Sequence, residues 1–437
     1  MELRREYFLF FLSPLLLVVI GVGLLQILGQ GGRPHRSEEH QGELLLQEVL
    51  DLVDREYVVD TDSERLTYGA AKGIARSLDR YCRVYEKDEW NSRRKKDAGE
   101  YDGIGIQTHV LRGFVTAIKV GRDGPAWRAG MRDGDVILEV DGWKIGRKPV
   151  LRGVLERIQG PSATEVKILL RDFHGSQPRQ VNVVRGTASS ESVYGEILDG
   201  HPGVGYVRIE TFNDNTDNQF ESVLRRVAAT GLDAMVLDLR GNHGGSLPVS
   251  VAIADRFLRG GRVVTMVGRH GTEPYVARDD RSDLEIPLVV LVDQGTASAA
   301  EVVAGALHDH GRAVLVGART FGKGVVQGIF RFRYGAGGMK LTTAHYLTPA
   351  SLCIEKELAL GGGRKRRGGL RPDLPIPLSK LERGYAMELA DRRRYQPFIR
   401  RALAVEDRSL PREFKDSQLA RALALLAGID DDIPTEE

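Results

Sequence analysis

The sequence predicts an α/β core, a mixed sheet covered by helices, with an inserted β-rich domain and an N-terminal transmembrane helix. Residues 204–316 alternate apolar strand-like runs with helix-periodic segments, which is the pattern of a sheet flanked by helices. Residues 97–186 contain short β-type runs separated by glycine-rich turns. Residues 7–28 contain no charged side chain, and about 20 apolar residues suffice to cross a hydrocarbon core.

The N-terminus indicates where the rest of the chain lies. Arg4 and Arg5 precede the apolar stretch, so the positive-inside rule places the N-terminus in the cytoplasm. The remainder is then expected outside, in the periplasm or cell envelope. The alternative is a cleaved signal peptide and a secreted protein. No small-x-small cleavage site follows Leu28, although glycines at residues 29–32 leave this alternative open.

Composition excludes several classes of protein. An apolar fraction of 42% and a charged fraction of 28% are those of a globular protein. The formal net charge of +2 gives no reason to expect nucleic acid as a partner. Cys82 and Cys353 are too few for a disulfide-stapled fold, and we expect two unpaired thiols, although pairing stays open. No cysteine or histidine spacing indicates a metal, and we predict no cofactor.

The order of parts follows from changes in pattern. Residues 30–42 are polar and contain glycine, which indicates a linker. Apolar residues recur at helical spacing after it, so we expect a small helical region that caps the core. A glycine-flanked basic stretch, residues 361–369, indicates an exposed loop without an assigned function. The predicted parts are the anchor 7–28, linker 30–42, helical region 43–96, inserted domain 97–186, core 187–380 and helical tail 381–437.

Individual elements are predicted from the same patterns. The inserted domain should contain strands 114–120, 136–140, 166–170 and 181–184, with one helix at 150–158. The core should contain strands 204–209, 234–239, 288–292, 313–316 and 339–346. Its helices should span 217–229, 248–258 and 298–308, and the tail should contain a helix at 418–426.

Ser298 is the first residue whose position indicates chemistry. It follows an apolar strand at 288–292 and opens a helix, so it lies at the rim of the sheet beside free N–H groups that stabilise an oxyanion. A serine that only caps the helix is the alternative. The helix descends and strand 313–316 returns, which brings Lys323 to the same rim.

Lys323 is the candidate general base. His308 is a rival, but it lies ten residues down the same helix, about 15 Å from Ser298. A lysine accepts a proton only when neutral, so its pKa must fall, as burial would cause. Phe321 and Val325 are apolar neighbours in the sequence, and Gln327 offers an uncharged acceptor that would orient the amine.

A second glycine-rich turn points to the same rim. Strand 234–239 ends in Arg240-Gly241-Asn242-His243-Gly244-Gly245. The amide of Gly244 or Gly245 is free to approach a substrate carbonyl, as an oxyanion hole requires. A phosphate cradle is the alternative, but the turn lacks the GxxxxGK[ST] pattern.

Three motifs together resemble those of the carboxyl-terminal processing (tail-specific) proteases. They are the two turns above, 238–245 and 295–301, and Thr320-Phe321-Gly322-Lys323-Gly324 with Gln327. The resemblance implies that Ser298 attacks the peptide bond, that Lys323 is the general base and that Gln327 orients it. It also implies that the amide of Ala299 holds the oxyanion, with Gly244 or Gly245. His243 and Ala300 depart from the family pattern, which usually has proline and serine there.

The inserted domain resembles a PDZ domain. Tyr101-Asp102-Gly103-Ile104-Gly105-Ile106 is similar to the carboxylate-binding loop, and residues 124–137 are similar to the next PDZ motif. By edge-strand addition, amides at Gly103, Ile104 and Gly105 would receive a terminal carboxylate while the peptide pairs with the strand that holds Ile104 and Ile106. A purely structural β domain is the alternative.

These features predict a membrane-anchored serine endopeptidase that recognises protein C-terminal tails and hydrolyses peptide bonds with a Ser-Lys dyad. Its partners would be proteins or peptides with accessible C-termini, and the membrane through the N-terminal helix. The alternative is a catalytically silent PDZ-type scaffold at the membrane. A β-lactamase-type enzyme would need lysine three residues after the serine, where Glu301 stands. The physiological substrate and the oligomeric state stay open.

Overall fold

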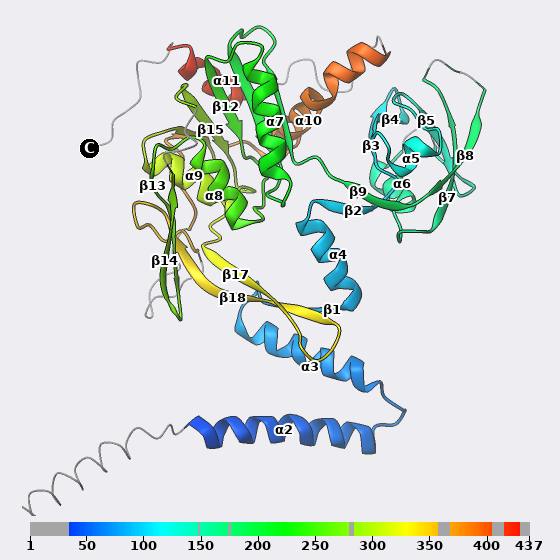
Figure 1. Cartoon of the computed structure of the whole chain (residues 1–437), viewed down its shortest axis with the longest axis vertical. Helices are drawn as coiled ribbons and strands as arrows, with labels where there is room; N and C mark the ends of the chain where they lie inside the picture. The colour runs from blue at the N-terminus through cyan, green and yellow to red at the C-terminus, as the bar shows by residue number, and fades with distance from the viewer. Residues whose placement is uncertain are drawn as a thin grey trace, which may run out of the picture. The chain divides into compact units, whose positions relative to one another are not determined.

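The computed structural model describes residues 35–146, 149–173, 175, 177–278, 284–356, 368–403 and 415–428 (Figure 1). The chain divides after Leu78 into two compact units. The predicted anchor, residues 7–28, lies outside the described residues. Among the residues that are described, no helix has both the length and the apolar character needed to span a bilayer.

The described part of the first unit contains α2 (His35–Glu56) and α3 (Ser63–Leu78). The predicted linker 30–42 is wrong from His35 onward, because α2 begins there. Gly42 favoured the linker, but one glycine costs a helix only about 1 kcal/mol relative to alanine. The predicted helical region 43–96 is also divided, since β1 (Arg83–Glu86) and α4 (Lys87–Asp97) belong to the second unit.

The core of the second unit is a six-stranded sheet in the order β10-β11-β12-β15-β16-β19. β10 pairs antiparallel with β11, and all other neighbours are parallel. The carboxyl ends of the parallel strands therefore meet at one rim. The strands are β10 (Val193–Ile197), β11 (Val204–Ile209), β12 (Ala234–Asp238), β15 (Leu288–Val292), β16 (Val314–Gly317) and β19 (Leu374–Pro375).

Helices cover both faces of this sheet. One apolar cluster joins one face to α7 (Thr216–Ala228), α8 (Leu247–Asp255) and α9 (Ala299–Asp309). A second cluster joins the opposite face to α11 (Ser417–Leu426). The mixed α/β core predicted from the alternating pattern is therefore present, and β15 is buried along its whole length, as its LVVLV sequence indicates.

A second sheet lies beside the core in the order β1-β18-β13-β14, with β17 paired to β18. Its strands are β13 (Gly261–Gly268), β14 (Gly271–Ala277), β17 (Val325–Arg331) and β18 (Gly337–Leu347). Only β18 was predicted. β14 is largely exposed and polar, so it lacks the apolar run that identified the buried strands. The end of β17 is exposed, and Gln327 and Gly328 interrupt its apolar residues.

The inserted domain has its own apolar core. Its sheet runs β3-β4-β5-β7-β8, with β6 on β5. β2 (Glu100–Gly103) and β9 (Gly186–Ser189) pair where the chain enters and leaves the domain. The other elements are β3 (Ile106–Leu111), β4 (Phe114–Val120), α5 (Pro125–Arg128), β5 (Val136–Val140), β6 (Trp143–Lys144), α6 (Leu151–Ile158), β7 (Glu165–Arg171) and β8 (Arg179–Val184).

The tail forms α10 (Lys380–Leu403) and α11, which reach back to the core. Arg240, 2% exposed, donates through Nη1 to Asp416 at 3.0 Å and to Gln418 at 3.1 Å. It also donates to Asp238, which is fully buried and accepts from the hydroxyl of Tyr206 at 2.6 Å. The start of α11 is thus bonded to the residue that precedes the Gly241–Gly245 turn.

We expect Asp416→Ala to destabilise the fold by about 3 kcal/mol, because it leaves part of a buried guanidinium charge uncompensated. Urea unfolding measures the effect. Glu156→Ala is the control, since Glu156 pairs with Arg152 at an exposed site and should cost less than about 1 kcal/mol. Equal unfolding midpoints for the two variants would show that the ion pair to α11 contributes nothing.

Candidate active site

Ser298 lies in a strained turn between β15 and α9. Its φ of 57° is in the left-handed region, which a residue with a Cβ adopts only when its surroundings hold it there. Asp293 holds this turn by accepting from the amides of Gly241, Gly295 and Thr296. The serine therefore stands at the N-terminus of α9, where backbone N–H groups lack helical partners.

Glu301, fully buried, ties the Ser298 turn to the Lys323 loop. Its Oε2 accepts from the amides of Ser298 and Lys323, each at 2.9 Å. Its Oε1 accepts from the amide of Gly322 at 2.8 Å and from the hydroxyl of Thr320. Burial raises the pKa of the Glu301 carboxyl, and these four donors act against that. Because all four groups donate hydrogen bonds, they suit the ionised carboxylate. The amides of Ser298 and Lys323 share one acceptor oxygen, so the two backbone segments lie next to each other.

Tyr346 provides a second tie between the same two segments. Its buried hydroxyl lies between the carbonyl oxygens of Ser298 and Lys323, at 3.0 Å and 2.5 Å. Tyr346 belongs to β18, in the second sheet. The Ser298 turn from one sheet is therefore held against the Lys323 loop by a residue from the other.

The Lys323 side chain is held by Gln327 and Tyr81. Nζ donates to Gln327 Oε1 at 3.1 Å, and Gln327 Nε2 donates to the carbonyl of Tyr81 at 2.7 Å. Nζ also lies 5.1 Å from the centre of the Tyr81 ring. Within the described part of the chain, Nζ makes no hydrogen bond to the Ser298 hydroxyl. The amine is thus anchored by Gln327 and not by the Ser298 hydroxyl.

The surroundings lower the pKa of Lys323. Burial is the largest cause, because it disfavours the charged ammonium, and the nearby Arg93 guanidinium adds repulsion. The carboxylates of Glu355, Glu301 and Asp79 oppose the shift. The net direction favours the neutral amine that a general base requires.

The Gly241–Gly245 turn packs directly against Ser298. A Cβ on Gly244, whose φ is 93°, would lie 2.8 Å from the Cβ of Ser298 and 2.9 Å from the amide of Ala299. The Gly244 amide donates to Asn242 Oδ1 at 2.8 Å, so it is not available to an oxyanion. Among the described residues, the amides of Gly245 and Ala299 have no acceptor. Of the three amides predicted to hold an oxyanion, these two remain candidates.

Part of the predicted PDZ loop lines a cavity. Ile104, Gly105 and Ile106 border a cavity of about 280 Å³, with Leu155 and Ile158 of α6 among its other walls. β3 is the edge strand of its sheet, so its outer side is free for an added strand. The predicted Gly103 does not line this cavity. It pairs with Gly186 in the β2–β9 ladder instead.

Other candidate groups take no part in this arrangement. His308, at the far end of α9, contacts Asp309 and Asp373, which raise its pKa to about 10. Cys82 is buried, Cys353 is partly exposed, and both thiols are free. No cluster of metal-ligating side chains is present among the described residues. Most of the basic stretch 361–369 lies outside the described residues.

Sequence reasoning missed four of the residues that build the site. Glu301 stands three residues after Ser298, and this spacing is that of a helix capping box, so the signal was present. Tyr346, Tyr81 and Arg93 carry no local signal, because they reach the site from elements distant in the sequence.

Comparisons with known proteins identify both domains. Residues 203–376 match peptidase family S41, and residues 117–172 match the PDZ domain. A carboxyl-terminal-processing protease of Picosynechococcus sp. is 35% identical over 313 residues, 71% of this chain and 72% of that protein. A carboxy-terminal-processing protease of Bartonella bacilliformis is 29% identical over 352 residues, 79% of this chain and 77% of that one.

A solved structure shows the same fold. A Bacteroides fragilis protein assigned to the S41 proteases superposes with a TM-score of 0.50 at 16% identity, covering 88% of this chain and 98% of that protein. Fold and site together define a serine peptidase with an inserted PDZ domain. The chain belongs to the carboxyl-terminal processing proteases.

Glu301→Gln should lower the stability of the fold and abolish most of the peptidase activity. The amide NH₂ would face N–H donors, and losing bonds to a charged acceptor costs about 2 kcal/mol. Urea unfolding and peptide cleavage measure the two effects. Glu156→Gln, at an exposed ion pair, should leave both unchanged. Wild-type activity in Glu301→Gln would show that the carboxylate does not hold the site together.

Proposed function

We propose that the chain is a membrane-anchored endopeptidase with a Ser-Lys dyad, which cleaves extracytoplasmic proteins that it recognises by their C-terminal tails. The main support for the dyad is the Glu301 carboxylate, because one of its oxygens accepts hydrogen bonds from the amides of both Ser298 and Lys323. The lowered pKa of Lys323 supports its role as the base.

The proposed reaction begins with proton transfer from the Ser298 hydroxyl to the neutral amine of Lys323. The Ser298 oxygen then attacks the substrate carbonyl, and amides of Ala299 and Gly245 donate to the oxyanion. Lys323, now protonated, gives its proton to the departing amine as the peptide bond breaks. A water molecule hydrolyses the acyl-enzyme, again with Lys323 as base. Gln327 keeps the amine at the site by accepting its hydrogen bond.

The PDZ domain supplies the proposed selection of substrates. A C-terminal carboxylate would bind the loop of Ile104, Gly105 and Ile106, and the tail would add a strand to β3. The side chain of Ile104 is buried, and Leu155 and Ile158 line the same cavity. An apolar last residue therefore suits the site.

The proposed location rests on the sequence of residues 7–28. An apolar stretch behind Arg4 and Arg5 would anchor the chain and leave the peptidase outside the cytoplasm. Secretion after signal cleavage is the alternative. Extraction of membranes with sodium carbonate distinguishes them, since an anchored chain stays in the pellet and a cleaved chain does not.

Ser298→Ala and Lys323→Ala should each lower cleavage of an unfolded protein with an apolar C-terminus, such as β-casein, about a thousandfold or more. Gel electrophoresis of the products measures the rate. Arg225→Ala, at an exposed position on α7, is the control. Wild-type cleavage by both variants would eliminate the dyad, whereas absence of cleavage by wild type would leave a tail-binding scaffold.

The pH dependence of kcat/KM should report the neutral fraction of Lys323. Activity should rise with pH through a pKa below the 10.5 of an ordinary lysine. Arg93→Gln removes a repelling cation, so the pKa of Lys323 should rise and the ascending limb should move to higher pH. Arg93→Lys keeps the charge and should leave the limb in place. Coincident profiles for Arg93→Gln and wild type would show that Arg93 does not tune the base.

A further inference from the structure

β10 is the edge strand of the core sheet, and half of its backbone groups point away from that sheet. The carbonyl of Ser192 and the amide of Leu198, which flank the strand, both bond to residues of the β11 segment. Hydrogen bonding alternates along an antiparallel pair. The amides and carbonyls of Val193, Gly195 and Ile197 are therefore directed outward.

A hydrogen bond from one side chain confirms that the Gly195 carbonyl points outward. Arg226 Nη2, from α7, donates to the carbonyl of Gly195 at 3.0 Å. Within the described part of the chain, the amides of Val193, Gly195 and Ile197 have no acceptor. Unpaired groups along a sheet edge form a template for another strand.

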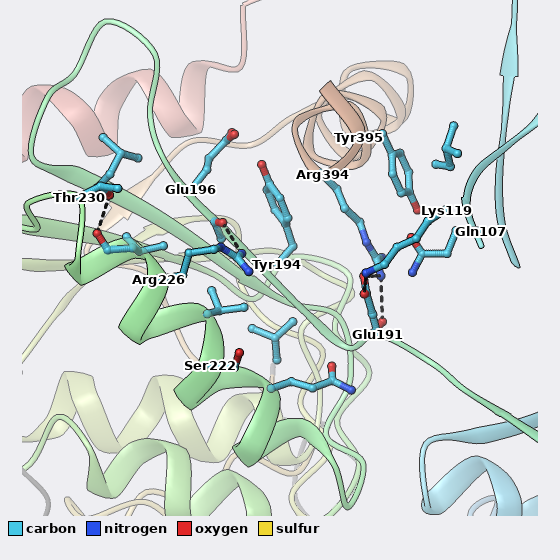
Figure 2. A pocket seen from close by; sticks show the side chains of 17 residues that line it. Gln107, Lys119, Glu191, Tyr194, Glu196, Ser222, Arg226, Thr230, Arg394 and Tyr395 are labelled. Carbon is cyan, nitrogen blue, oxygen red and sulfur yellow. Dashed lines mark hydrogen bonds and ion pairs between the residues drawn. The ribbon is translucent and has the colours of Figure 1, made fainter. Parts of the chain in front are cut away.

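A cavity of about 690 Å³ runs along all of β10, from Val193 to Ile197 (Figure 2). Ser222 and Arg226 of α7 line one side of it, and Lys119 of the PDZ domain and Tyr395 of α10 line the other. Five residues of added strand would extend roughly 17 Å. The edge is thus accompanied by space along its whole length.

Charged groups at one end of the cavity are paired with one another. Glu191 accepts from Lys119 and, at 3.3 Å, from Arg394, which also donates to Glu210 at 3.0 Å (Figure 2). These bonds join β4 of the PDZ domain, the segment after β9 and α10. Because these charges compensate each other, they give little selection for a charged ligand.

The same wall residues connect this cavity to the PDZ cavity. Gln107, Glu191, Arg394 and Tyr395 line both. A substrate whose tail occupies the PDZ domain therefore has another part of its chain close to β10. The two sites would act on one polypeptide and raise its effective concentration at each.

We propose that the outer edge of β10 is a second peptide-binding site, at which an extended segment of the protein substrate pairs as an added strand. Main-chain hydrogen bonds to Val193, Gly195 and Ile197 would supply affinity with little dependence on sequence. Arg226 would leave the carbonyl of Gly195 when the segment binds. This inference rests on the proposed function, because the occupant is a substrate of the peptidase.

Photo-crosslinking tests binding without requiring hydrolysis. In the Ser298→Ala chain, p-benzoylphenylalanine replaces Ser222, which lines the cavity, or Arg225, which is exposed on α7 and does not. Irradiation with β-casein should give a crosslinked product at position 222 in at least about tenfold excess over position 225. No product at 222, or equal products at both positions, would overturn the proposal.

Cleavage kinetics separate this site from the dyad. Ser222→Trp fills the cavity and should raise KM for β-casein about tenfold, while kcat and the cleavage of a short tail peptide stay unchanged. Arg225→Trp, exposed on α7 outside the cavity, should behave as wild type with both substrates. An unchanged KM for β-casein, or an equal loss with both substrates, would refute the β10 site. Absence of cleavage by wild type would instead refute the proposed function, and the crosslinking result would still stand.

Discussion

One buried carboxylate holds the site together. Glu301 has no contact with solvent, so its charge must be balanced by hydrogen-bond donors. Those donors are the amides of Ser298, Gly322 and Lys323 and the hydroxyl of Thr320. Because a buried charge needs these donors, Glu301 holds the Ser298 and Lys323 segments together. In this fold, the bonds that balance the charge of Glu301 are the same bonds that bring the Ser298 and Lys323 backbones together.

The two sheets contribute different parts of the reaction centre. The parallel sheet presents Ser298 and the Gly241–Gly245 turn at the carboxyl ends of its strands. The second sheet supplies Gln327 and Tyr346, which lie on β17 and β18. Ser298 is therefore held by a strained turn and a helix start, whereas Lys323 is held by a polar and aromatic pocket. The pKa of Lys323 is therefore lowered in part by a neighbour from another element, Arg93 of α4.

The sequence predicted the parts whose causes are local. Strands β11 and β15 have the predicted bounds, because both are buried and apolar. The meeting of Ser298 and Lys323 at one rim followed from the rise of a helix and a returning strand. The hydrogen bond from the Gly244 amide to the Asn242 side chain could not be predicted from the sequence, because it depends on the conformation of the turn. β14 was missed because its side chains face solvent, and Tyr81 because only tertiary packing brings it to Gln327.

The bond between Arg240 and Asp416 spans 176 positions of the chain. The Arg240 guanidinium therefore meets its second carboxylate only when the start of α11 has docked on the core. Before docking, its carboxylate partner is Asp238, two residues away in the sequence. The charge balance beside the Gly241–Gly245 turn is thus completed by a distant part of the chain, so the docking of α11 and the support of this turn are coupled.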